Sequence, residues 1–459
     1  MEENMYTYST YVHLDLWKER AVLGGLQRRL AERERAGAPI RVGLVGAGQM
    51  GLGLAAVLGR IPGMRLVAVA DLVVGRAAAA LRQNGAERAK IAEARTGVEA
   101  RAASARGRLV ATVAPEAVTE LPVDVVVDAT GVPLQAALTA SWAMEARRHV
   151  ILLTVEADVT VGHLLAKRAA EAGVVYTGAT GDEPAATKEL VEFAEFLGFE
   201  VVCAGKGKNN PLDRRANAQS LAAEARTSGV NPRLLAEFVD GTKSMVEMAC
   251  LANATGLLPD VRGMHGAKAT PAELAHVFIP EADGGILRRR GVVDFAMGAA
   301  PGVFVVVHTD HPVIHEELRY LKLGAGPYFA LFRPFHLTSI ETPVSIARAA
   351  LEGEASICPL PTPVAEVITV AKRRLQSGER LGLAGEDTVY GLIEEAAVAC
   401  RENLLPLGLA ARAEVLRDLE ADQPIRWDDV EVDDTPLLTM RREQDSLVGA
   451  GLLAPIRNS

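Results

Sequence analysis

The chain has 459 residues, 49% of them hydrophobic and 23% charged, which is enough for about two or three domains with separate cores. Its formal net charge of −9 excludes non-specific nucleic-acid binding, which needs a basic surface. The four cysteines are scattered without a CxxC pair, and no stretch approaches the roughly 20 apolar residues of a membrane helix. These features, with an N-terminus that has early acids and no apolar run, predict a cytoplasmic protein with reduced thiols and with neither a membrane nor nucleic acid as a partner.

The first part of the chain alternates predicted strands and helices. Residues 13–35 have apolar residues at helical spacing and predict an amphipathic helix. Apolar runs after this helix predict buried parallel strands at 41–48, 65–71, 108–113, 123–131, 149–158 and 174–184. The Ala- and Arg-rich insert 72–107 predicts helix. The alternation indicates the α/β class, with a doubly wound parallel sheet of the Rossmann type over residues 1–184.

The pattern changes after residue 185. Helices such as KELVEFAEFLG mix with strands such as GVFVVVHT, which predicts an α+β substrate domain over residues 185–345. After the break PLPTP, short charged strands with tight turns predict a small, β-rich unit. This linker and unit occupy residues 346–459.

Three glycines in VGAGQMGLGLA, Gly46, Gly48 and Gly51, have the spacing G-x-G-x-x-G between a predicted strand and a predicted helix. The first permits a tight turn, the second lets a pyrophosphate approach the backbone, and the third lets the helix pack closely. Because the motif opens a strand–helix–strand unit, it predicts a dinucleotide site that also includes Gln49 and Met50.

Asp71 ends the second strand of that unit, where a carboxylate accepts hydrogen bonds from both ribose hydroxyls. A carboxylate there repels a 2′-phosphate, so the sequence favours NAD(H) over NADP(H). The alternative is that Asp71 only caps the next helix while Arg76 attracts the phosphate of NADP(H). Thr130 and Gly131, which end the stretch DATG, are expected beside the cofactor; the alternative for them is an ordinary turn.

Four later segments concentrate polar residues at predicted strand exits or helix starts: TVEADVT, TGDEP, GKGKNNP and DGTKSMVEMACLANATG. Ligands of open α/β sheets bind beyond the carboxyl ends of the strands, so the first three segments should converge beside the nicotinamide. The predicted catalytic residues are Lys206, Lys208, Glu156, Asp182 and Glu247. The predicted substrate-binding residues are Asn209, Asn210, Lys243, Asn253 and His265.

Several of these residues also have structural interpretations. Asp182 and Glu183 precede a proline, as helix-capping acids do. Glu247 fits a capping box that starts at Ser244; otherwise it lies in an apolar helix and needs a partner, for which Lys243, one turn earlier, is the candidate.

Asn253 and His265 have structural alternatives as well. Asn253 precedes a glycine and is compatible with a helix end. His265 stands in a Gly-rich loop, where a structural role is as reasonable as a catalytic one.

The lysines of AGKGKNNPL are the strongest signal. In an extended segment Lys206 and Lys208 point to the same side, and Pro211 holds Asn210 extended. Two ammonium groups that face one way repel each other unless an anion lies between them. The pair therefore predicts a site for a phosphate, or for a carbonyl oxygen that gains charge as hydride arrives.

At these residues the sequence resembles the deoxyxylulose-phosphate reductoisomerase-like oxidoreductases, which are related to homoserine dehydrogenase and carry a C-terminal SAF (β-clip) domain. The resemblance runs from about residue 38 to 430, with AGKGKNNPL and VEMACLANATG as its most specific motifs. The other motifs are RVGLVGAGQMG, DATG, VEADVTVG, GDEP, LLPDVRGMHG, PGVFVVV, GPYFALFRPFHLTS and PLPTPVAEV.

The resemblance implies a homodimer with a Rossmann domain, a homoserine-dehydrogenase-like catalytic domain and an SAF domain. It also implies NADPH-dependent conversion of 1-deoxy-D-xylulose 5-phosphate to 2-C-methyl-D-erythritol 4-phosphate, a step of isoprenoid biosynthesis. Asp71 departs from this pattern, because a binder of 2′-phosphate normally has Ser or Arg there; a related pentulose phosphate with NAD(H) is therefore also considered. The metal-binding carboxylates of the conventional reductoisomerase are not recognisable by pattern, so a divalent metal stays open.

Two other hypotheses remain. One is a homoserine-dehydrogenase-like oxidoreductase that acts on a small unphosphorylated hydroxy-aldehyde. The other is a non-catalytic NAD-sensing protein whose SAF domain binds a carbohydrate or another partner.

Overall fold

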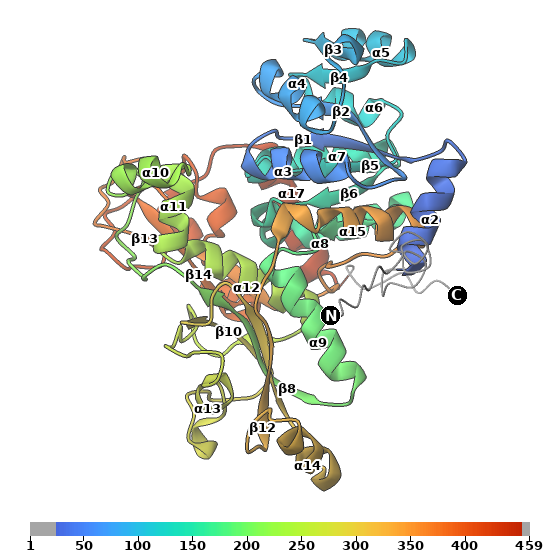
Figure 1. The fold of residues 1–459 in the computed structure, drawn as a ribbon. Helices are drawn as coiled ribbons and strands as arrows, with labels where there is room; N and C mark the ends of the chain where they lie inside the picture. The colour runs from blue at the N-terminus through green and yellow to red at the C-terminus, as the bar shows by residue number, and fades with distance from the viewer. Residues whose placement is uncertain (1–23, 452–459) are drawn as a thin grey trace, which may run out of the picture.

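The computed structural model describes residues 24–451. Of the helix expected over 13–35, the described part is α2 (Gly24–Arg35), and the remaining expectation lies outside the described residues. Two larger sheets and a C-terminal region with small sheets follow along the chain (Figure 1). Among residues 24–451, no helix has the length and apolar character needed to cross a membrane.

The first sheet has seven strands in the order β3-β4-β2-β1-β5-β6-β7, and all of its neighbours pair in parallel. This confirms the predicted Rossmann-like sheet. The strands are β1 (Ile40–Val45), β2 (Met64–Ala70), β3 (Ile91–Ala94), β4 (Leu109–Thr112), β5 (Val125–Asp128), β6 (His149–Leu152) and β7 (Tyr176–Gly178). Its helices are α3 (Gln49–Leu58), α4 (Val74–Gln83), α5 (Gly97–Ala105), α6 (Pro115–Glu120), α7 (Pro133–Glu145) and α8 (Val155–Ala172).

The register of this sheet aligns the strand ends that face the ligand. Val45 pairs with Ala70 on one side and with Asp128 on the other, so β1, β2 and β5 end at the same level. The glycine loop, Asp71 and the segment with Thr130 therefore leave the sheet at one edge, as expected for a doubly wound fold.

Two predictions for this region are corrected. The insert 72–107 is not all helical, because β3 forms the edge strand of the sheet. The run 149–158 is strand only as far as Leu152, and α8 begins at Val155. Glu156 and Asp158 thus lie in the first turn of a helix, where the positive end of the helix dipole favours acidic side chains.

The second sheet is mixed, which confirms the expected α+β character. Its order is β12-β11-β8-β10-β9; β8 runs parallel to β10 and antiparallel to β11. The strands are β8 (Glu200–Lys208), β9 (Leu258–Pro259), β10 (Val292–Met297), β11 (Val303–His308) and β12 (Tyr328–Arg333). One face packs on α9 (Glu183–Phe196) and α12 (Thr242–Thr255), and α13 (Leu274–Val277) packs on the other. Beside them lie α10 (Ala222–Ser228), α11 (Pro232–Val239) and α14 (Pro312–Tyr320).

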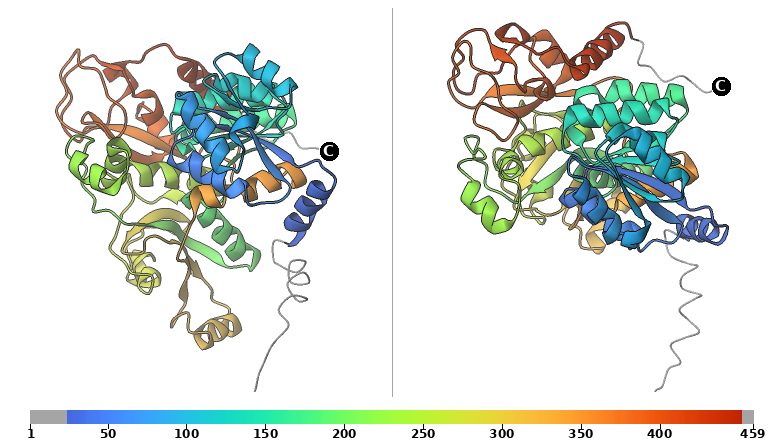
Figure 2. Two further views of the ribbon diagram at one scale, coloured as in Figure 1. Left: turned by 45° about the horizontal axis from the view of Figure 1, so that its top comes forward. Right: turned by 90° about the horizontal axis from the view of Figure 1, so that it is seen from above.

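The chain then returns to the Rossmann sheet before it enters the C-terminal region. Ile346 and Ala347, on α15 (Thr342–Ala347), belong to the same core as Leu44 of β1. The C-terminal region has the expected small sheets, β13 (Ala365–Ala371) with β14 (Val389–Glu395), and β15 (Glu414–Val415) with β16 (Val430–Glu431). It also contains α16 (Ala396–Arg401) and α17 (Pro436–Gly449); α17 packs against α7 and α8 (Figure 2).

Candidate active site

A cavity of about 950 Å³ extends from the glycine loop to the C-terminal region. At the loop end its wall includes Ala47, Gly48, Gln49, Met50, Arg76, Thr130 and Gly131. At the other end it includes Glu156, Asp182, Glu183, Arg233, Glu237, Lys243, Glu247, His336 and Glu366. The volume is that of a small-molecule site, and charged side chains are concentrated at one end of it.

The glycine loop has the geometry that a dinucleotide needs. Gly46 has a φ of +98°, and a Cβ on it would lie 2.6 Å from the carbonyl oxygen of Ala129. A Cβ on Gly51 would lie 2.0 Å from the carbonyl oxygen of Gly46, whereas a Cβ on Gly48 would meet no described atom within 4 Å. Gly48 is also the N-cap of α3, so an anion can approach this helix end through open space. The residues therefore fit the pyrophosphate of NAD(P).

Asp71 supports this loop. Its two carboxylate oxygens accept hydrogen bonds from the backbone N–H groups of Ala47 and Val73, each at 2.9 Å. A carboxylate oxygen has more than one lone pair, so a ribose hydroxyl can still donate to it. Arg76 lines the same end of the cavity, and Asp71 contacts that end through the N–H group of Ala47, which is part of the cavity wall.

Thr130 and Gly131 line the cavity as expected. The Thr130 hydroxyl donates to Asp128 Oδ1 at 2.9 Å, and Gly131 N donates to the Thr154 hydroxyl at 3.0 Å. Burial raises the pKa of Asp128 to about 6, although hydrogen bonds from Thr154 and Thr130 oppose this rise. The turn is fixed to β5 and to the start of α8, which gives the cofactor a rigid surface.

An ion pair between Lys243 and Glu156 lies at the charged end of the cavity. Lys243 Nζ is 2.7 Å from Glu156 Oε1, and both side chains belong to the cavity wall. Burial lowers the pKa of Lys243, but Glu156 and then Glu247 raise it more strongly, so the net pKa lies above the ordinary value of lysine. The ammonium therefore stays protonated and can donate to an oxygen of a ligand.

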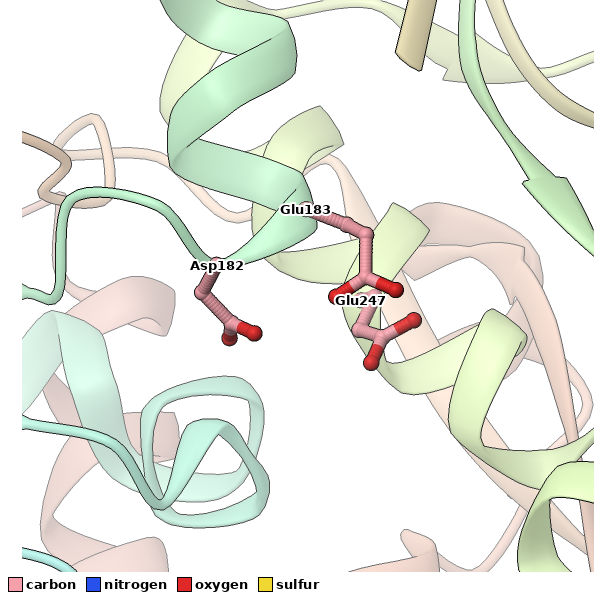
Figure 3. A group of neighbouring side chains, drawn as sticks. All are labelled: Asp182, Glu183 and Glu247. Atoms are coloured by element: carbon pink, nitrogen blue, oxygen red, sulfur yellow. The ribbon is translucent and has the colours of Figure 1, made fainter. Parts of the chain in front are cut away.

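A second buried group joins Lys206 to two carboxylates. Lys206 Nζ is 2.7 Å from Glu183 Oε1 and also donates to Glu247. Figure 3 shows the carboxylates of Glu183 and Glu247 next to each other. Lys243 was the expected partner of Glu247 from helical spacing; instead Lys243 pairs with α8, and Lys206 reaches Glu247 from β8. The capping alternative for Glu247 also fails, because α12 begins at Thr242.

The surroundings shift the pKa values of the two carboxyls in opposite directions. Burial and the nearby charge of Glu183 raise the pKa of Glu247 to about 7, although Lys206 opposes the rise. Burial also acts on Glu183, but Lys206 and His336 outweigh it and lower its pKa to about 2. His336 Nε2 lies 3.3 Å from Glu183 Oε1. Glu247 is thus the carboxyl of this pair that exchanges a proton near neutral pH.

Asp182 completes a three-carboxylate cluster with Glu183 and Glu247. One oxygen of each lies within 4.8 Å of the others (Figure 3). Burial, Glu183 and Glu247 together raise the pKa of Asp182 well above its ordinary value. Carboxylate oxygens are ligands that Mg²⁺ and Ca²⁺ accept. The ammonium of Lys206 already supplies a positive charge to two of the three groups.

Lys208 and the two asparagines after it lie differently from the prediction. Lys206 and Lys208 do share one side of β8, but Lys208 Nζ donates to the backbone oxygen of Phe238. Burial, and then Lys206, lower the pKa of Lys208 to about 8. Asn209 and Asn210 follow the end of β8; Asn209 is exposed, and neither is part of the cavity wall. The pair of lysines is therefore not one open anion site.

Asn253 and His265 have structural contacts away from the cavity wall. The Asn253 amide accepts from Val364 N at 2.9 Å and donates to the backbone oxygen of Ala365 at 3.0 Å. His265 Nε2 lies 2.7 Å from Asp260 Oδ2. Asn253 thus holds the entry into β13, and His265 holds a loop beside β10.

Four residues of the charged end were not assigned from sequence: Arg233, Glu237, His336 and Glu366. Arg233 Nη1 donates to Glu237 Oε1 at 2.5 Å, four residues along α11. Burial and the charge of Glu156 raise the pKa of Glu237 to about 8, against the effect of Arg233. The i,i+4 spacing of Arg233 and Glu237 was readable, but nothing in the sequence placed α11 at the cavity.

Comparisons with known proteins agree with the second sheet as the catalytic part. Residues 181–342 match the family described as "Oxidoreductase DRL, catalytic domain". No curated protein matches the chain.

Three of the solved structures with similar regions are described as dehydrogenases. A probable dehydrogenase from Thermotoga maritima is 15% identical, with 69% of this chain and 90% of that chain covered at a TM-score of 0.39. A myo-inositol dehydrogenase from Corynebacterium glutamicum is 12% identical, with 69% and 89% covered at 0.38. A UDP-N-acetylglucosamine 3-dehydrogenase from Acidithiobacillus ferrooxidans is 13% identical, with 70% and 92% covered at 0.38. At these TM-scores the similarity carries no further conclusion.

Proposed function

We propose that the chain, which belongs to the oxidoreductase DRL family through the catalytic domain at residues 181–342, is an NAD(P)H-dependent reductoisomerase of a ketose phosphate. The observation that carries the proposal is the Lys243–Glu156 pair, which lines the same cavity as the dinucleotide loop and lies beside the carboxyl of Glu247. A ketose rearrangement needs a base for a hydroxyl proton and a donor for a carbonyl oxygen. The charged end of the cavity offers both.

Glu247, Lys243 and Glu156 would carry out the rearrangement. The Glu247 carboxylate takes the proton of a substrate hydroxyl, and its pKa of about 7 suits this exchange near neutral pH. As that oxygen becomes a carbonyl, a C–C bond migrates to the former carbonyl carbon, whose oxygen accepts a hydrogen bond from the Lys243 ammonium and takes a proton from solvent. Glu156 stabilises the ammonium and fixes its direction.

The reduction completes the balance. When bound, NAD(P)H supplies the hydride that the new carbonyl carbon accepts. The carboxyl of Glu247 gives its proton to the oxygen of the reduced carbonyl, and Lys243 stays protonated throughout. The net reaction consumes one ketose phosphate, one NAD(P)H and one proton, and it yields a branched polyol phosphate. With 1-deoxy-D-xylulose 5-phosphate as the substrate, this reaction serves isoprenoid biosynthesis.

Arg233 is the proposed phosphate ligand, in place of the lysines of β8. Lys206 and Lys208 both donate to groups of the protein, whereas Arg233 lines the cavity. Its Nη1 contacts Glu237 and the backbone oxygen of Ala384, and its Nε and Nη2 have no hydrogen bond among residues 24–451. A guanidinium can bind phosphate through two such donors at once.

NAD(H) is the proposed cofactor form, on the carboxylate of Asp71. Replacement of Asp71 by Asn should raise kcat/KM with NADPH relative to NADH by about tenfold, because the repulsion of the 2′-phosphate is removed. Replacement of Arg76 by Ala is the matched change. If Arg76→Ala abolishes a preference of the wild type for NADPH, the alternative with Arg76 is correct.

The test of the proposed function is a survey of substrates. Oxidation of NADH and NADPH would be followed with 1-deoxy-D-xylulose 5-phosphate, D-xylulose 5-phosphate and D-ribulose 5-phosphate, and with the corresponding free sugars. We expect turnover of a phosphorylated ketose and a branched product in the carbon NMR spectrum. Absence of turnover with all of these sugar phosphates contradicts the proposal.

A second candidate is a homoserine-dehydrogenase-like reduction of a small unphosphorylated hydroxy-aldehyde. The observation in its favour is that both lysines of β8 are engaged inside the protein. It predicts that kcat/KM does not change when the substrate phosphate is removed, and that Arg233→Ala has no effect. The homodimer implied by the family resemblance also stays a proposal, which sedimentation velocity would test.

A further inference from the structure

The helix that carries Glu156 is held at its second turn by the last described helix of the chain. Gln444 of α17 is 3% exposed, and its carboxamide contacts two backbone groups of α8. Nε2 donates to the oxygen of Thr160 at 3.3 Å, and Oε1 accepts from Leu164 N at 3.0 Å. In a regular helix these two backbone groups bond to each other. The Gln444 side chain therefore contacts both backbone groups of one hydrogen-bonding position of α8 and ties that turn to α17.

Arg441, one turn earlier on α17, contacts the same place. Its Nη1 donates to the oxygen of Thr160 at 3.3 Å and pairs with Glu366 Oε2 at 2.6 Å. Its Nε donates to Asp445 at 2.8 Å. Glu366 belongs to the cavity wall, so Arg441 connects α8, the entry of β13 and the cavity.

Thr160 is also contacted by a loop of the C-terminal region, and it connects to the candidate site. A Cβ on Gly408 would lie 2.0 Å from Thr160 Oγ1, so the loop fits against Thr160 only with glycine there. Thr160 Oγ1 in turn donates to the backbone oxygen of Glu156 at 2.6 Å. Gln444, Arg441 and Gly408 thus all meet at the residue that bonds to Glu156.

We propose that Gln444 and Arg441 are positioning residues for the Lys243–Glu156 pair. By holding the second turn of α8, they set the direction of its first turn and hence the position of the Glu156 carboxylate against Lys243. The chemical step then depends on the C-terminal region, whereas cofactor binding does not. The inference rests on the proposed function, in which Lys243, held by Glu156, donates a hydrogen bond to the reacting oxygen.

The variant that tests this is Gln444→Leu, which keeps the approximate size of the side chain and removes both bridging bonds. The Leu164 N–H and the Thr160 oxygen can still bond to each other as i and i−4 of the helix, but α17 no longer holds them through Gln444. We expect kcat to fall by about 10- to 100-fold, as displacements of about 1 Å do, with an unchanged Kd for NADH. Arg441→Lys, which keeps the charge, should retain more activity than Arg441→Met. Arg442→Ala, an exposed position on the same helix, is the matched control and should behave as the wild type.

Two readouts need no substrate and separate this inference from the proposed function. Hydrogen exchange of the peptide 153–165 and the rate of Lys243 acylation by an activated ester should both rise in Gln444→Leu and stay unchanged in Arg442→Ala. If both rise while no ketose phosphate is turned over by the wild type, the positioning role stands and the proposed function fails. If Gln444→Leu folds, as judged by circular dichroism, and exchange, acylation and kcat all equal those of the wild type, the positioning role is refuted.

Discussion

The two ends of the cavity are built in different ways. The cofactor end is built mainly on one backbone segment, residues 46–51, with a positive-φ glycine, a glycine that has open space around it and a helix N-terminus. The substrate end consists of side chains from segments far apart in sequence, which meet as buried ion pairs. A backbone site depends on one local conformation, whereas an ion-pair site depends on the packing of several elements. The first should therefore tolerate changes at the second.

The largest effect is expected at the pair that contacts the reacting oxygen. Lys243→Met should lower kcat by about 10²- to 10³-fold, because the charged hydrogen-bond donor to the reacting oxygen is lost. The Kd for NADH, from fluorescence titration, should stay within about twofold of the wild type, because the glycine loop is untouched. Glu156→Gln, which changes the partner of Lys243 and keeps the size of its side chain, should lower kcat less than Lys243→Met does. A large rise in the Kd for NADH would mean that the two ends are not independent.

The next largest effect is expected on the stability of the fold, to which Lys206 contributes as the common partner of two buried carboxylates. Lys206→Met leaves Glu183 and Glu247 buried without their common cation, which should cost about 3–5 kcal/mol in the free energy of unfolding. Urea denaturation would measure it. Lys90→Met removes an exposed ion pair with Glu87 and should change the free energy by about 0–1 kcal/mol. Equal effects of the two changes would contradict the burial argument.

A pH effect of a few kcal/mol is expected from Glu237. Its pKa is about 8 in the folded chain against 4.5 in the unfolded chain, so the folded chain keeps a proton that the unfolded chain releases. The free energy of unfolding should therefore fall as pH rises from about 4.5 to about 8. Glu237→Gln should make this slope shallower by about one proton, and the same change at the exposed Glu443 should not. Parallel slopes for Glu237→Gln and the wild type would refute the shift.

The smallest effect compares two glycines of the cofactor loop. Gly48→Ala has space for its Cβ, so the melting temperature should stay within about 1 °C while the affinity for NADH falls by about tenfold. Gly51→Ala places a Cβ against the Gly46 oxygen, so it should lower both the melting temperature and the affinity. Calorimetry with and without NADH would separate them. An unchanged affinity in Gly48→Ala would argue against a pyrophosphate at that position.

The same contrast explains what could be predicted from sequence. The Rossmann-like sheet, the mixed second sheet and the glycine loop follow from continuous patterns, because strand runs and G-x-G-x-x-G are local signals. The importance of polar residues such as Glu156 and Glu247 was also readable.

Their partners were not readable from sequence. Helical spacing predicted that Glu247 pairs with Lys243. In the fold β8 packs against α12, so Glu247 pairs with Lys206 of β8, and Lys243 pairs with Glu156 of α8. Likewise, His336 and Glu237 come from segments whose place at the cavity depends on tertiary contacts alone. No periodic pattern encodes such contacts between distant elements.

In the proposed reaction the Lys243–Glu156 pair faces the reacting carbon of the bound cofactor. A crystal structure with bound NADH would show whether it does. We expect nicotinamide C4 to face Lys243 Nζ across a gap for one carbonyl group, about 5–6 Å, with the pyrophosphate on the glycine loop. A nicotinamide ring turned away from Lys243, toward a wall without ionisable side chains, would contradict it.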